Sequence, residues 1–238
     1  MSSEEVLELI PEHLAVIMDG NRRWAKLNNL STKFGHKEGA QRVTDLVRNC
    51  VSLGIKYLSV YAFSTENWKR DKKEVDYLMN LLVDFIVKEL DYLHKNDVKI
   101  TLMGNLDDLP LKTKKEVERS IELTKNNKTL HLNIALSYGS RNEIINAVKS
   151  IVIDYEKNNI NIDELNEKKF KDYLFTKGMP DPDLLIRTSG EIRLSNFLLY
   201  QLAYTEFYFT DVLWPDFNKE ELIKAIRNFQ SRKRRFGN

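Results

Sequence analysis

Short apolar segments alternate with longer amphipathic segments along almost the whole chain, and this alternation restricts the folds that the sequence can adopt. The apolar segments predict strands at residues 14–18, 57–63, 98–103, 131–137, 184–187 and 205–209. The amphipathic segments predict helices at about 36–53, 74–95, 112–126, 140–154, 167–175 and 218–232. We therefore expect an α/β fold with a mostly parallel central sheet of about six strands and with helices on both faces.

The length and hydrophobic content of the chain favour one domain. Its 238 residues, 42% of them hydrophobic, are enough to build one large core. No internal repeat or linker rich in Pro, Gly or Ser divides the sequence, and the polar stretch 155–169 is expected to be a surface loop. We predict a single domain over residues 1–238, with an N-terminal segment at 1–12 and a basic tail at 231–238.

Charge and cysteine content narrow the class of protein. The formal net charge of +2 gives no general attraction for nucleic acid, and the basic run SRKRR is short and lacks interleaved aromatic residues. The single cysteine, Cys50, excludes an intramolecular disulfide and suits a reducing compartment. The acidic N-terminus lacks the apolar core of a signal peptide, and no segment has the length of a membrane span. We expect a cytoplasmic protein that does not bind nucleic acid.

The segments that follow four of the predicted strands are rich in Arg, Asn, Ser and acidic residues. They read DGNRR, STENWKR, YGSRNE and RTSGEIRLSN. In a parallel sheet, ligands bind outside the carboxyl ends of the strands. These side chains bind phosphate groups and the metals that accompany them, so the sequence predicts a site for a phosphorylated ligand. An ordinary solvated loop is the alternative at each segment.

Asp19 stands at the first of these turns and is followed by Gly20, Asn21, Arg22 and Arg23. Mg²⁺ is commonly held by one or two carboxylates together with substrate phosphates, so Asp19 is a candidate ligand of magnesium or anchor of a diphosphate. A helix cap is the alternative, because Asp and Asn both favour that position. The two arginines oppose the dipole of the helix that they begin, which favours the anion-binding interpretation.

Two further segments supply candidates at the predicted edge. His36, between two glycines, can donate to a phosphate or transfer a proton, or can simply lie in the first turn of a helix. Ser64 and Asn67 can form a hydrogen-bond network near a reacting carbon, and Arg70 can clamp a phosphate with two N–H groups. Trp68, in the same segment, is more typical of packing.

The densest group of candidates follows the fifth predicted strand. Arg187, Arg193 and Ser195 alternate with apolar residues at a spacing that can converge on a diphosphate, with solvated arginines around a turn as the alternative. Glu206 begins the last apolar segment, where a carboxylate needs a metal or an arginine as its partner.

The predicted helix at 74–93 is apolar over a wide arc. Its apolar residues include Val75, Leu78, Leu81, Leu82, Phe85, Ile86, Val87 and Leu90. A well-buried helix explains this pattern. The functional interpretation is that the helix forms one wall of a long apolar tunnel.

Several of these segments together resemble the cis-prenyltransferase family, specifically the bacterial undecaprenyl diphosphate synthases. The matching segments are HLAVIMDGNRRWAK, FGHKEG, YAFSTENWKR, LNIALSYGSRNEI, PDPDLLIRTSGEIRLSNFLLYQLAYTEFYF, LWPDF and RRFG, which cover nearly the whole chain from about residue 13. The resemblance implies repeated, Mg²⁺-dependent condensation of isopentenyl diphosphate onto farnesyl diphosphate with cis geometry. The implied product is a long polyprenyl diphosphate, undecaprenyl diphosphate, which is the precursor of the cell-wall lipid carrier. It further implies a homodimer with peripheral contact to the inner face of the membrane.

The resemblance also implies a role for individual residues. Asp19 matches the catalytic aspartate that engages the metal, Asn67 matches a residue tied to condensation and proton loss, and Glu206 matches a metal-site glutamate. Glu74 matches an acid that follows a flexible loop of the family. The implied substrate-binding residues are Gly20, Asn21, Arg22, Arg23, Trp24, His36, Ser64, Thr65, Glu66, Trp68, Arg70, Arg187, Arg193, Ser195, Arg235 and Gly237. The last two form a motif that in relatives reaches the site of the partner subunit.

The chain departs from the family pattern at two positions. Thr32 stands where an arginine is usual, and the adjacent Lys33 is the candidate replacement. Ile192 stands where some relatives have a histidine, so the resemblance implies no metal role there.

Three other classes fit the sequence less well. An aspartyl phosphatase needs a second acid two residues after the first, where this chain has Asn21. A trans-type prenyltransferase needs DDxxD motifs, and DDLPL at 107–111 lacks the final acid. A subunit that only activates a catalytic partner is expected to have lost Asp19 and the arginines at the strand ends, which are present here.

Overall fold

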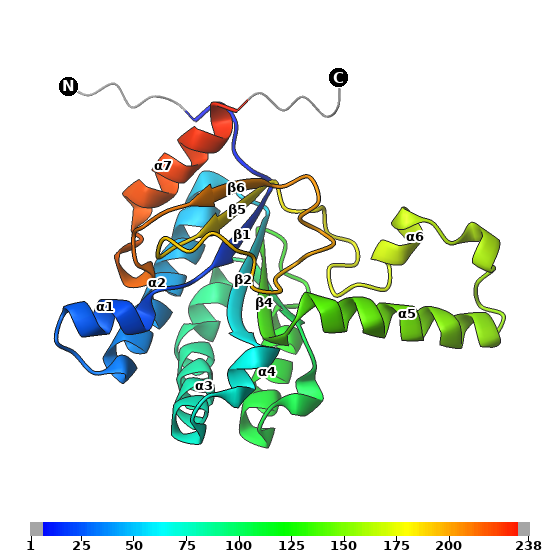
Figure 1. Ribbon diagram of the computed structural model, residues 1–238, viewed down its shortest axis with the longest axis horizontal. Coiled ribbons are helices and arrows are strands. Elements are labelled where there is room, and N and C mark those ends of the chain that lie inside the picture. Colours follow the sequence, from blue (N-terminus) through cyan, green and yellow to red (C-terminus); the bar gives the residue numbers. More distant parts are fainter. Residues whose placement is uncertain (1–6, 233–238) are drawn as a thin grey trace.

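The computed structural model describes residues 7–232 and contains a six-stranded sheet in which every neighbouring pair of strands is parallel. The strands are β1 (His13–Ile17), β2 (Tyr57–Ser64), β3 (Val98–Met103), β4 (Leu130–Tyr138), β5 (Leu184–Arg187) and β6 (Glu206–Phe209). Their order across the sheet is β3-β4-β2-β1-β5-β6 (Figure 1). The predicted α/β class and parallel sheet are confirmed. Arg235 and Gly237 lie outside the described residues.

Seven helices connect and cover these strands within residues 7–232. They are α1 (Asn21–Leu27), α2 (Thr32–Leu53), α3 (Lys72–Lys95), α4 (Leu111–Thr124), α5 (Ser140–Glu156), α6 (Glu167–Lys171) and α7 (Lys219–Gln230). The helix predicted from residue 36 begins earlier, because the Ser31 side chain accepts a hydrogen bond from the backbone N–H of Phe34. The predicted loop at 155–169 contains the end of α5, a short 3₁₀ turn (Ile162–Glu164) and the start of α6.

One face of the sheet is covered by α2, α3, α4 and α7. Alternate strand residues, among them Leu14, Val16, Leu58 and Val60, point to this face and form a continuous core with the helices. Within residues 7–232, no helix is long and apolar enough to cross a membrane.

The other face of the sheet differs from the prediction of helices on both faces. The connection from β5 to β6 contains no helix, and its irregular chain packs Phe197, Leu198 and Leu202 against the strands. The helix α5 lies nearby but runs away from the sheet, and it forms an arm with α6 (Figure 1). This irregular connection carries polar residues to the carboxyl edge of β1 and β5, where a regular helix would have directed most of them to solvent.

Candidate active site

The turns after β1 and β5 lie side by side at the carboxyl edge of the sheet. Ile17, the last residue of β1, is paired in register with Arg187, the last residue of β5. Asp19 therefore lies close to the Arg187 side chain, although the two residues are far apart in sequence. The edge predicted from the strand ends is the one at which these groups meet.

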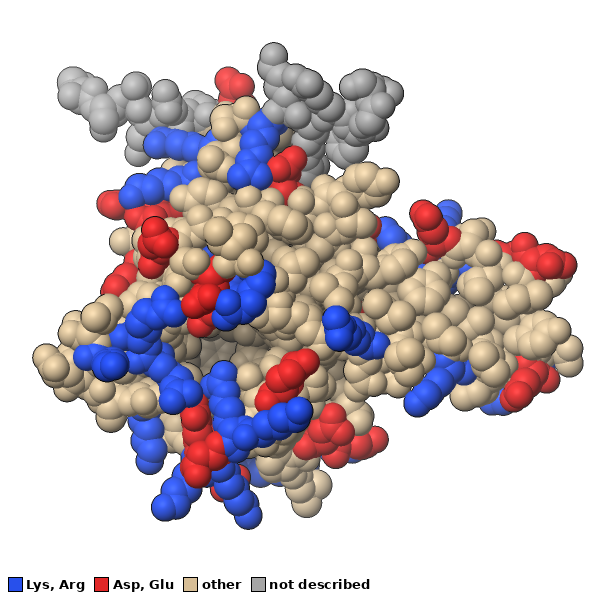
Figure 2. Space-filling view, in the orientation of Figure 1, with Lys and Arg blue, Asp and Glu red and all other residues tan. Residues whose placement is uncertain are grey.

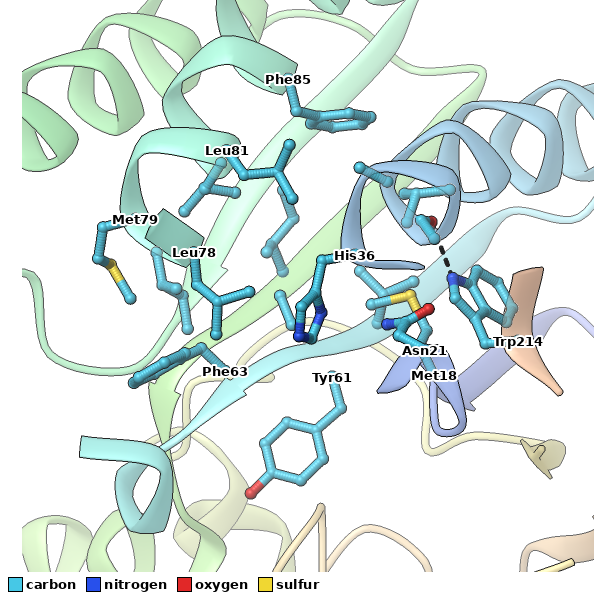
Figure 3. A pocket seen from close by; sticks show the side chains of 18 residues that line it. Met18, Asn21, His36, Tyr61, Phe63, Leu78, Met79, Leu81, Phe85 and Trp214 are labelled. Carbon is cyan, nitrogen blue, oxygen red and sulfur yellow. Dashed lines mark hydrogen bonds between the residues drawn. The ribbon is translucent and has the colours of Figure 1, made fainter. Parts of the chain in front are cut away.

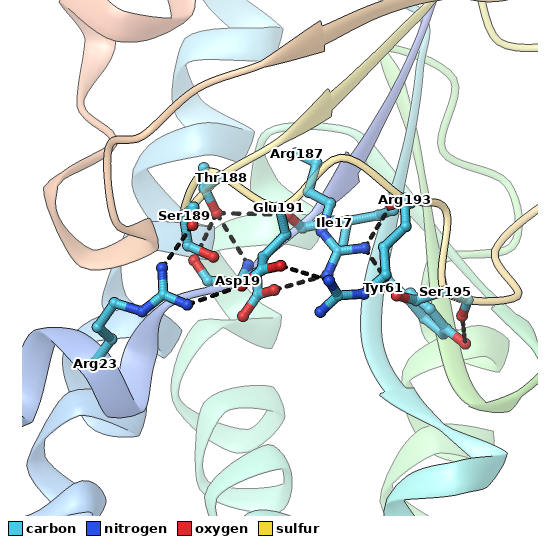
Figure 4. A network of polar contacts seen from close by, with 10 residues as sticks. All are labelled: Ile17, Asp19, Arg23, Tyr61, Arg187, Thr188, Ser189, Glu191, Arg193 and Ser195. Carbon is cyan, nitrogen blue, oxygen red and sulfur yellow. Dashed lines mark hydrogen bonds and ion pairs between the residues drawn. The ribbon is translucent and has the colours of Figure 1, made fainter.

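Arg187 is the centre of a polar network that Figure 4 shows. Its side chain is only 4% exposed, and its Nη2 donates to Asp19 Oδ2 at 2.8 Å. Its Nη1 donates to Ser195 Oγ at 2.8 Å and to the Arg193 carbonyl. The buried Nε has no hydrogen-bond partner among the described residues. A buried guanidinium with an unused N–H beside a single carboxylate is suited to receive an anionic oxygen.

Thr188 fixes the backbone of Asp19, and this residue was not predicted from the sequence. Its Oγ1 accepts a hydrogen bond from the Asp19 N–H at 3.0 Å and donates to the Asp19 carbonyl at 2.6 Å. The backbone N–H of Trp214 donates to the same carbonyl at 3.0 Å. These bonds leave the carboxylate free of any role in the turn, so Asp19 is not acting as a helix cap. The only sequence signal for Thr188 was its position next to Arg187.

Most of the predicted residues line one polar pocket of about 480 Å³ beside this network. Figure 2 shows a hollow on this face with Lys and Arg side chains around it. The predicted residues among its walls are Asp19, Gly20, Asn21, Arg22, Arg23, His36, Ser64, Asn67, Arg70, Arg187, Arg193 and Ser195. The pocket thus joins groups from α1, α2, the segment after β2 and the segment after β5.

Acidic side chains partly neutralise the cations of the pocket. Glu191 accepts hydrogen bonds from Arg23 and Arg193, and these bonds lower the pKa of its carboxyl group. Glu74 Oε1 lies 3.2 Å from Arg70 Nη1, and its other oxygen lies 3.9 Å from Arg22 Nη1. These carboxylates hold the arginines in place. A diphosphate that enters the pocket can therefore replace the carboxylates as the partner of the arginines.

His36 lies at the boundary of the polar pocket. Its Nε2 is buried and has no hydrogen-bond partner among the described residues, with Glu74 Oε1 at 3.6 Å. Burial lowers the pKa of His36, although the nearby Glu74 carboxylate opposes this shift. We therefore expect a neutral imidazole at pH 7, which can donate one N–H to a ligand.

The segment after β2 folds into a short 3₁₀ turn, Thr65–Lys69, that holds Asn67 toward the pocket. Asn67 Oδ1 accepts from the backbone N–H of Ser64 at 3.0 Å, which fixes the orientation of the amide. Its Nδ2 donates to no described residue and is free to bind a ligand oxygen. Trp68 instead packs against Phe63 and donates to Ser137 Oγ at 2.9 Å, so it supports the turn from behind.

Four other predicted residues do not line the polar pocket. Trp24 donates to Asp216 Oδ1, and Thr65 donates to Glu66, which in turn accepts from Asn196 Nδ2. Glu206 is paired in register with Leu184 at the amino end of its strand, and its carboxylate accepts from Arg232 Nη1 at 2.7 Å. Within the described chain, the structure does not bring Glu206 near Asp19.

The two positions that depart from the family pattern, Thr32 and Ile192, do not line the polar pocket. Thr32 lines an open groove next to Arg22 and Arg23. Lys33 does not line the pocket, since its ammonium lies 5.3 Å from the centre of the Tyr77 ring on α3. The replacement of the usual arginine by Lys33 therefore stays a prediction.

An apolar cavity of about 130 Å³ continues from the polar pocket between α2, α3 and the sheet (Figure 3). Met18, Tyr61 and Leu78 line both spaces. The apolar walls farther in include Val43, Val60, Met79, Leu81, Leu82, Phe85, Ile134 and Leu136. The interpretation of the 74–93 segment as one wall of an apolar tunnel agrees with this placement of α3.

Tyr61, another residue not predicted from the sequence, stands where the two spaces meet. Its hydroxyl is 3.2 Å from both the Tyr138 and the Ser195 carbonyl oxygens, and its ring stacks on Phe197 at 4.6 Å between centroids. Burial raises the pKa of the Tyr61 hydroxyl, so it stays protonated and acts as a donor. The sequence signal for Tyr61 was its position two residues before Phe63 on β2, since side chains two apart on a strand point to the same face.

A divalent cation fits this site only together with a ligand. Within residues 7–232 no three His, Cys, Asp or Glu side chains converge as a metal site. Asp19 Oδ1, however, accepts no hydrogen bond from the described residues, and the surrounding arginines are suited to phosphate. One carboxylate together with diphosphate oxygens and water is a donor set that Mg²⁺ accepts.

Comparisons with known proteins agree in both sequence and structure. Residues 17–237 match the family model described as putative undecaprenyl diphosphate synthase. The chain is 51% identical to an isoprenyl transferase of Clostridium perfringens, over 99% of this chain and 94% of the relative. It is 53% identical to a ditrans,polycis-undecaprenyl-diphosphate synthase, (2E,6E)-farnesyl-diphosphate specific, of Micrococcus luteus, over 96% of this chain and 92% of the relative.

Two solved structures share the fold over nearly the full length. Lavandulyl diphosphate synthase from Lavandula x intermedia, in complex with dimethylallyl diphosphate, has a TM-score of 0.93 and 37% identity, covering 96% of this chain and 98% of that one. A probable undecaprenyl diphosphate synthase from Campylobacter jejuni has a TM-score of 0.79 and 36% identity, covering 97% of this chain and 100% of that one.

Proposed function

The chain belongs to the undecaprenyl diphosphate synthase family, and from this premise we propose that it extends farnesyl diphosphate with isopentenyl diphosphate to undecaprenyl diphosphate. Membership of the family makes it a cis-prenyltransferase, a transferase of isoprenoid synthesis. The choice of farnesyl diphosphate as primer and the length of the product are the parts that we propose. Such a product would be the precursor of the cell-wall lipid carrier.

The observation that carries the proposal is the direct opening of a cationic pocket into an apolar cavity. A polyprenyl diphosphate has the same two parts, a diphosphate head and a hydrocarbon tail. At about 0.8 kcal/mol per buried CH₂ group, each added five-carbon unit gains roughly 3–4 kcal/mol in a dry cavity. This gain favours retention of the intermediate between successive additions.

The polar groups divide between the two diphosphates. We assign the diphosphate of isopentenyl diphosphate to Arg187, Arg193 and Ser195, and that of the allylic substrate to the turn at Gly20 and to Arg23. In each cycle the bond between C1 of the allylic chain and its diphosphate oxygen breaks. C1 then bonds to C4 of isopentenyl diphosphate, and a proton leaves C2 of that unit.

The proton and the leaving group are handled by different parts of the site. Asn67 offers a free Nδ2 donor that can orient a substrate oxygen, but an amide cannot accept the proton. We therefore assign the proton to an oxygen of the departing diphosphate. Enzymes of this family generally depend on a divalent metal, and a bound Mg²⁺, with Asp19 as its protein ligand, would stabilise the charge that develops on that diphosphate.

The proposal is tested by incorporation of labelled isopentenyl diphosphate into farnesyl diphosphate, with Mg²⁺ or with EDTA. A Mg²⁺-dependent series of products that ends at undecaprenyl diphosphate supports it. A purified, folded protein that incorporates no label contradicts it and indicates a subunit that requires a catalytic partner.

Product length is predicted to depend on Leu82. Leu82, Ile134 and Leu136 separate the apolar cavity from a smaller space of about 10 Å³ that continues toward Val117 of α4. Leu82→Ala removes part of this wall and is expected to shift the products to longer chains. Leu81→Ala is the matched control, because Leu81 lines the apolar cavity but not the smaller space beyond it. Unchanged chain lengths for Leu82→Ala, resolved by chromatography, would contradict this role.

We also propose that two copies of the chain associate through α5. The arm exposes an apolar face whose members follow helical spacing, Ile145, Val148, Val152 and Tyr155. A contiguous apolar face of this kind is typical of an interface between protein chains.

We propose that the protein is located in the cytoplasm, as expected from its single cysteine.

The dimer is predicted to dissociate when charge is placed on the α5 face. Val148→Asp with Val152→Asp buries two carboxylates in the proposed interface, and we expect a monomer by light scattering at micromolar concentration. Asn146→Asp with Ser150→Asp adds the same charges elsewhere on α5 and serves as the control. A dimer that survives the valine changes would place the interface elsewhere.

A further inference from the structure

The corner between α1 and α2 carries a strong local excess of positive charge. Residues 20–37 contain no Asp or Glu, whereas the whole chain has a net charge of only +2. Their basic residues are Arg22, Arg23, Lys26, Lys33 and Lys37. Lys26 and Lys37 are exposed and form no ion pair with any described residue. Arg22 and Arg23 pair with Glu74 and Glu191, so Lys26 and Lys37 are the cations of this corner that the described chain leaves unpaired.

The same corner exposes three large apolar side chains at its tip. Leu27 is 70% exposed, and Leu30 and Phe34 are each 41% exposed. Phe34 stacks against Trp24 with the ring planes 5° apart, which holds the tip in a fixed arrangement. An apolar tip with a basic surround is the arrangement by which peripheral proteins insert into the boundary of a lipid headgroup layer.

A groove connects this tip to the proposed active site. It has a volume of about 680 Å³ and is lined by Arg22, Arg23, Lys26, Leu30 and Thr32, among others. Arg22 and Arg23 also line the polar pocket, so the two spaces adjoin. Figure 2 shows the lobe of α1 beside the hollow, with Lys and Arg side chains between its outer end and the hollow.

We propose that the α1–α2 corner, defined as residues 22–37, docks the protein on an anionic membrane surface with the site opening next to the lipid. The inference rests on the proposed function, because a long-chain product needs an apolar destination. The lysines and arginines are attracted to anionic lipid headgroups, and each strengthens binding to the membrane by about fivefold. Leu27, Leu30 and Phe34 can bury apolar surface among lipid chains, whereas a nucleic acid backbone offers them no apolar contact.

Vesicle flotation tests this proposal without substrates. The full chain is mixed with phosphatidylcholine vesicles, or with vesicles that contain about 30% phosphatidylglycerol, at about 100 mM salt. We expect binding to the anionic vesicles only, and loss of binding at about 1 M salt. Leu27→Asn with Leu30→Asn is expected to reduce binding at least tenfold, and Lys26→Glu with Lys37→Glu at least as much.

The matched control for the leucines lies on α4. Leu111 and Leu123 are 68% and 42% exposed, close to the values of Leu27 and Leu30, so Leu111→Asn with Leu123→Asn changes equal apolar surface elsewhere. Lys112→Glu with Lys115→Glu, also exposed on α4, is the control for charge. Both controls are expected to bind vesicles as the unaltered chain does.

Three outcomes would overturn the proposal. They are absence of binding to anionic vesicles, equal loss in the corner and control variants, and stronger binding to duplex RNA that the leucine changes leave intact. A first condensation measured in parallel with soluble substrates separates this inference from the proposed function. Vesicle binding without condensation removes the function and keeps the docking surface, and condensation without vesicle binding does the reverse.

Discussion

Asp19→Asn is expected to lower kcat for condensation by about 10³-fold, the scale of losing a principal stabiliser of developing charge. Among the described residues that line the polar pocket, Asp19 is the only one with a carboxylate, and its loss leaves Arg187 without its counterion. The backbone bonds of Asp19 to Thr188 and Trp214 do not involve the carboxylate, so the turn should persist. Single-turnover formation of the first product measures the loss.

The matched control is Asp107→Asn, which removes a different aspartate from an ion pair with a basic residue, Lys114. Asp107 does not line the polar pocket, and we expect kcat within twofold of the unaltered enzyme. If Asp19→Asn retained more than about a tenth of the activity with an unchanged melting temperature, Asp19 would not be the metal-binding carboxylate of the reaction.

Gly35→Ala is expected to cost both stability and activity. A Cβ at Gly35 would lie 2.2 Å from the Asn21 carbonyl oxygen and 2.9 Å from Ala25 Cβ, so α1 would have to move away from α2. Overpacking of this kind typically costs about 1–3 kcal/mol. The movement displaces Asn21 and Arg23, and a shift of about 1 Å can reduce turnover by about 10²-fold.

The result is measured as kcat/KM for farnesyl diphosphate together with the urea midpoint. Alanine is normally a better helix former than glycine by about 1 kcal/mol, so a stabilised, active Gly35→Ala enzyme would show that the close approach of the helices is not required. Ser52→Ala, exposed near the other end of α2, controls for the new alanine and is expected to leave both quantities unchanged.

The strands were predictable because parallel strands buried on both faces form short continuous apolar segments. The observed bounds differ from the predicted ones by small shifts at the strand ends, as for the strand predicted at 205–209 and found at Glu206–Phe209. A helix was inferred after Asp19, but the bounds of α1 could not be inferred from the sequence, since seven residues are too few to display a helical period. Its position depends on contact with the glycines of α2, which the sequence pattern does not reveal.

Part of the site followed from one rule, that parallel strands deliver their carboxyl ends to a common edge. That rule placed Asp19, Asn67 and Arg187 together. It could not identify Thr188 or Tyr61, whose roles depend on hydrogen bonds between segments distant in sequence. The strand predicted at 205–209 already had Glu206 at its amino end, where the structure places it, and only the resemblance assigned this residue to the metal site.

The central claim is that the pocket around Asp19 and Arg187 and the apolar cavity behind Tyr61 form one substrate site. The most direct test is a crystal structure with isopentenyl diphosphate, Mg²⁺ and the unreactive farnesyl thiodiphosphate. The account predicts the farnesyl chain between α2 and α3 against Leu78 and Phe85, with its diphosphate at Asp19 and that of isopentenyl diphosphate at Arg187. A farnesyl chain bound outside this cavity, or a diphosphate that contacts neither Asp19 nor Arg187, would contradict it.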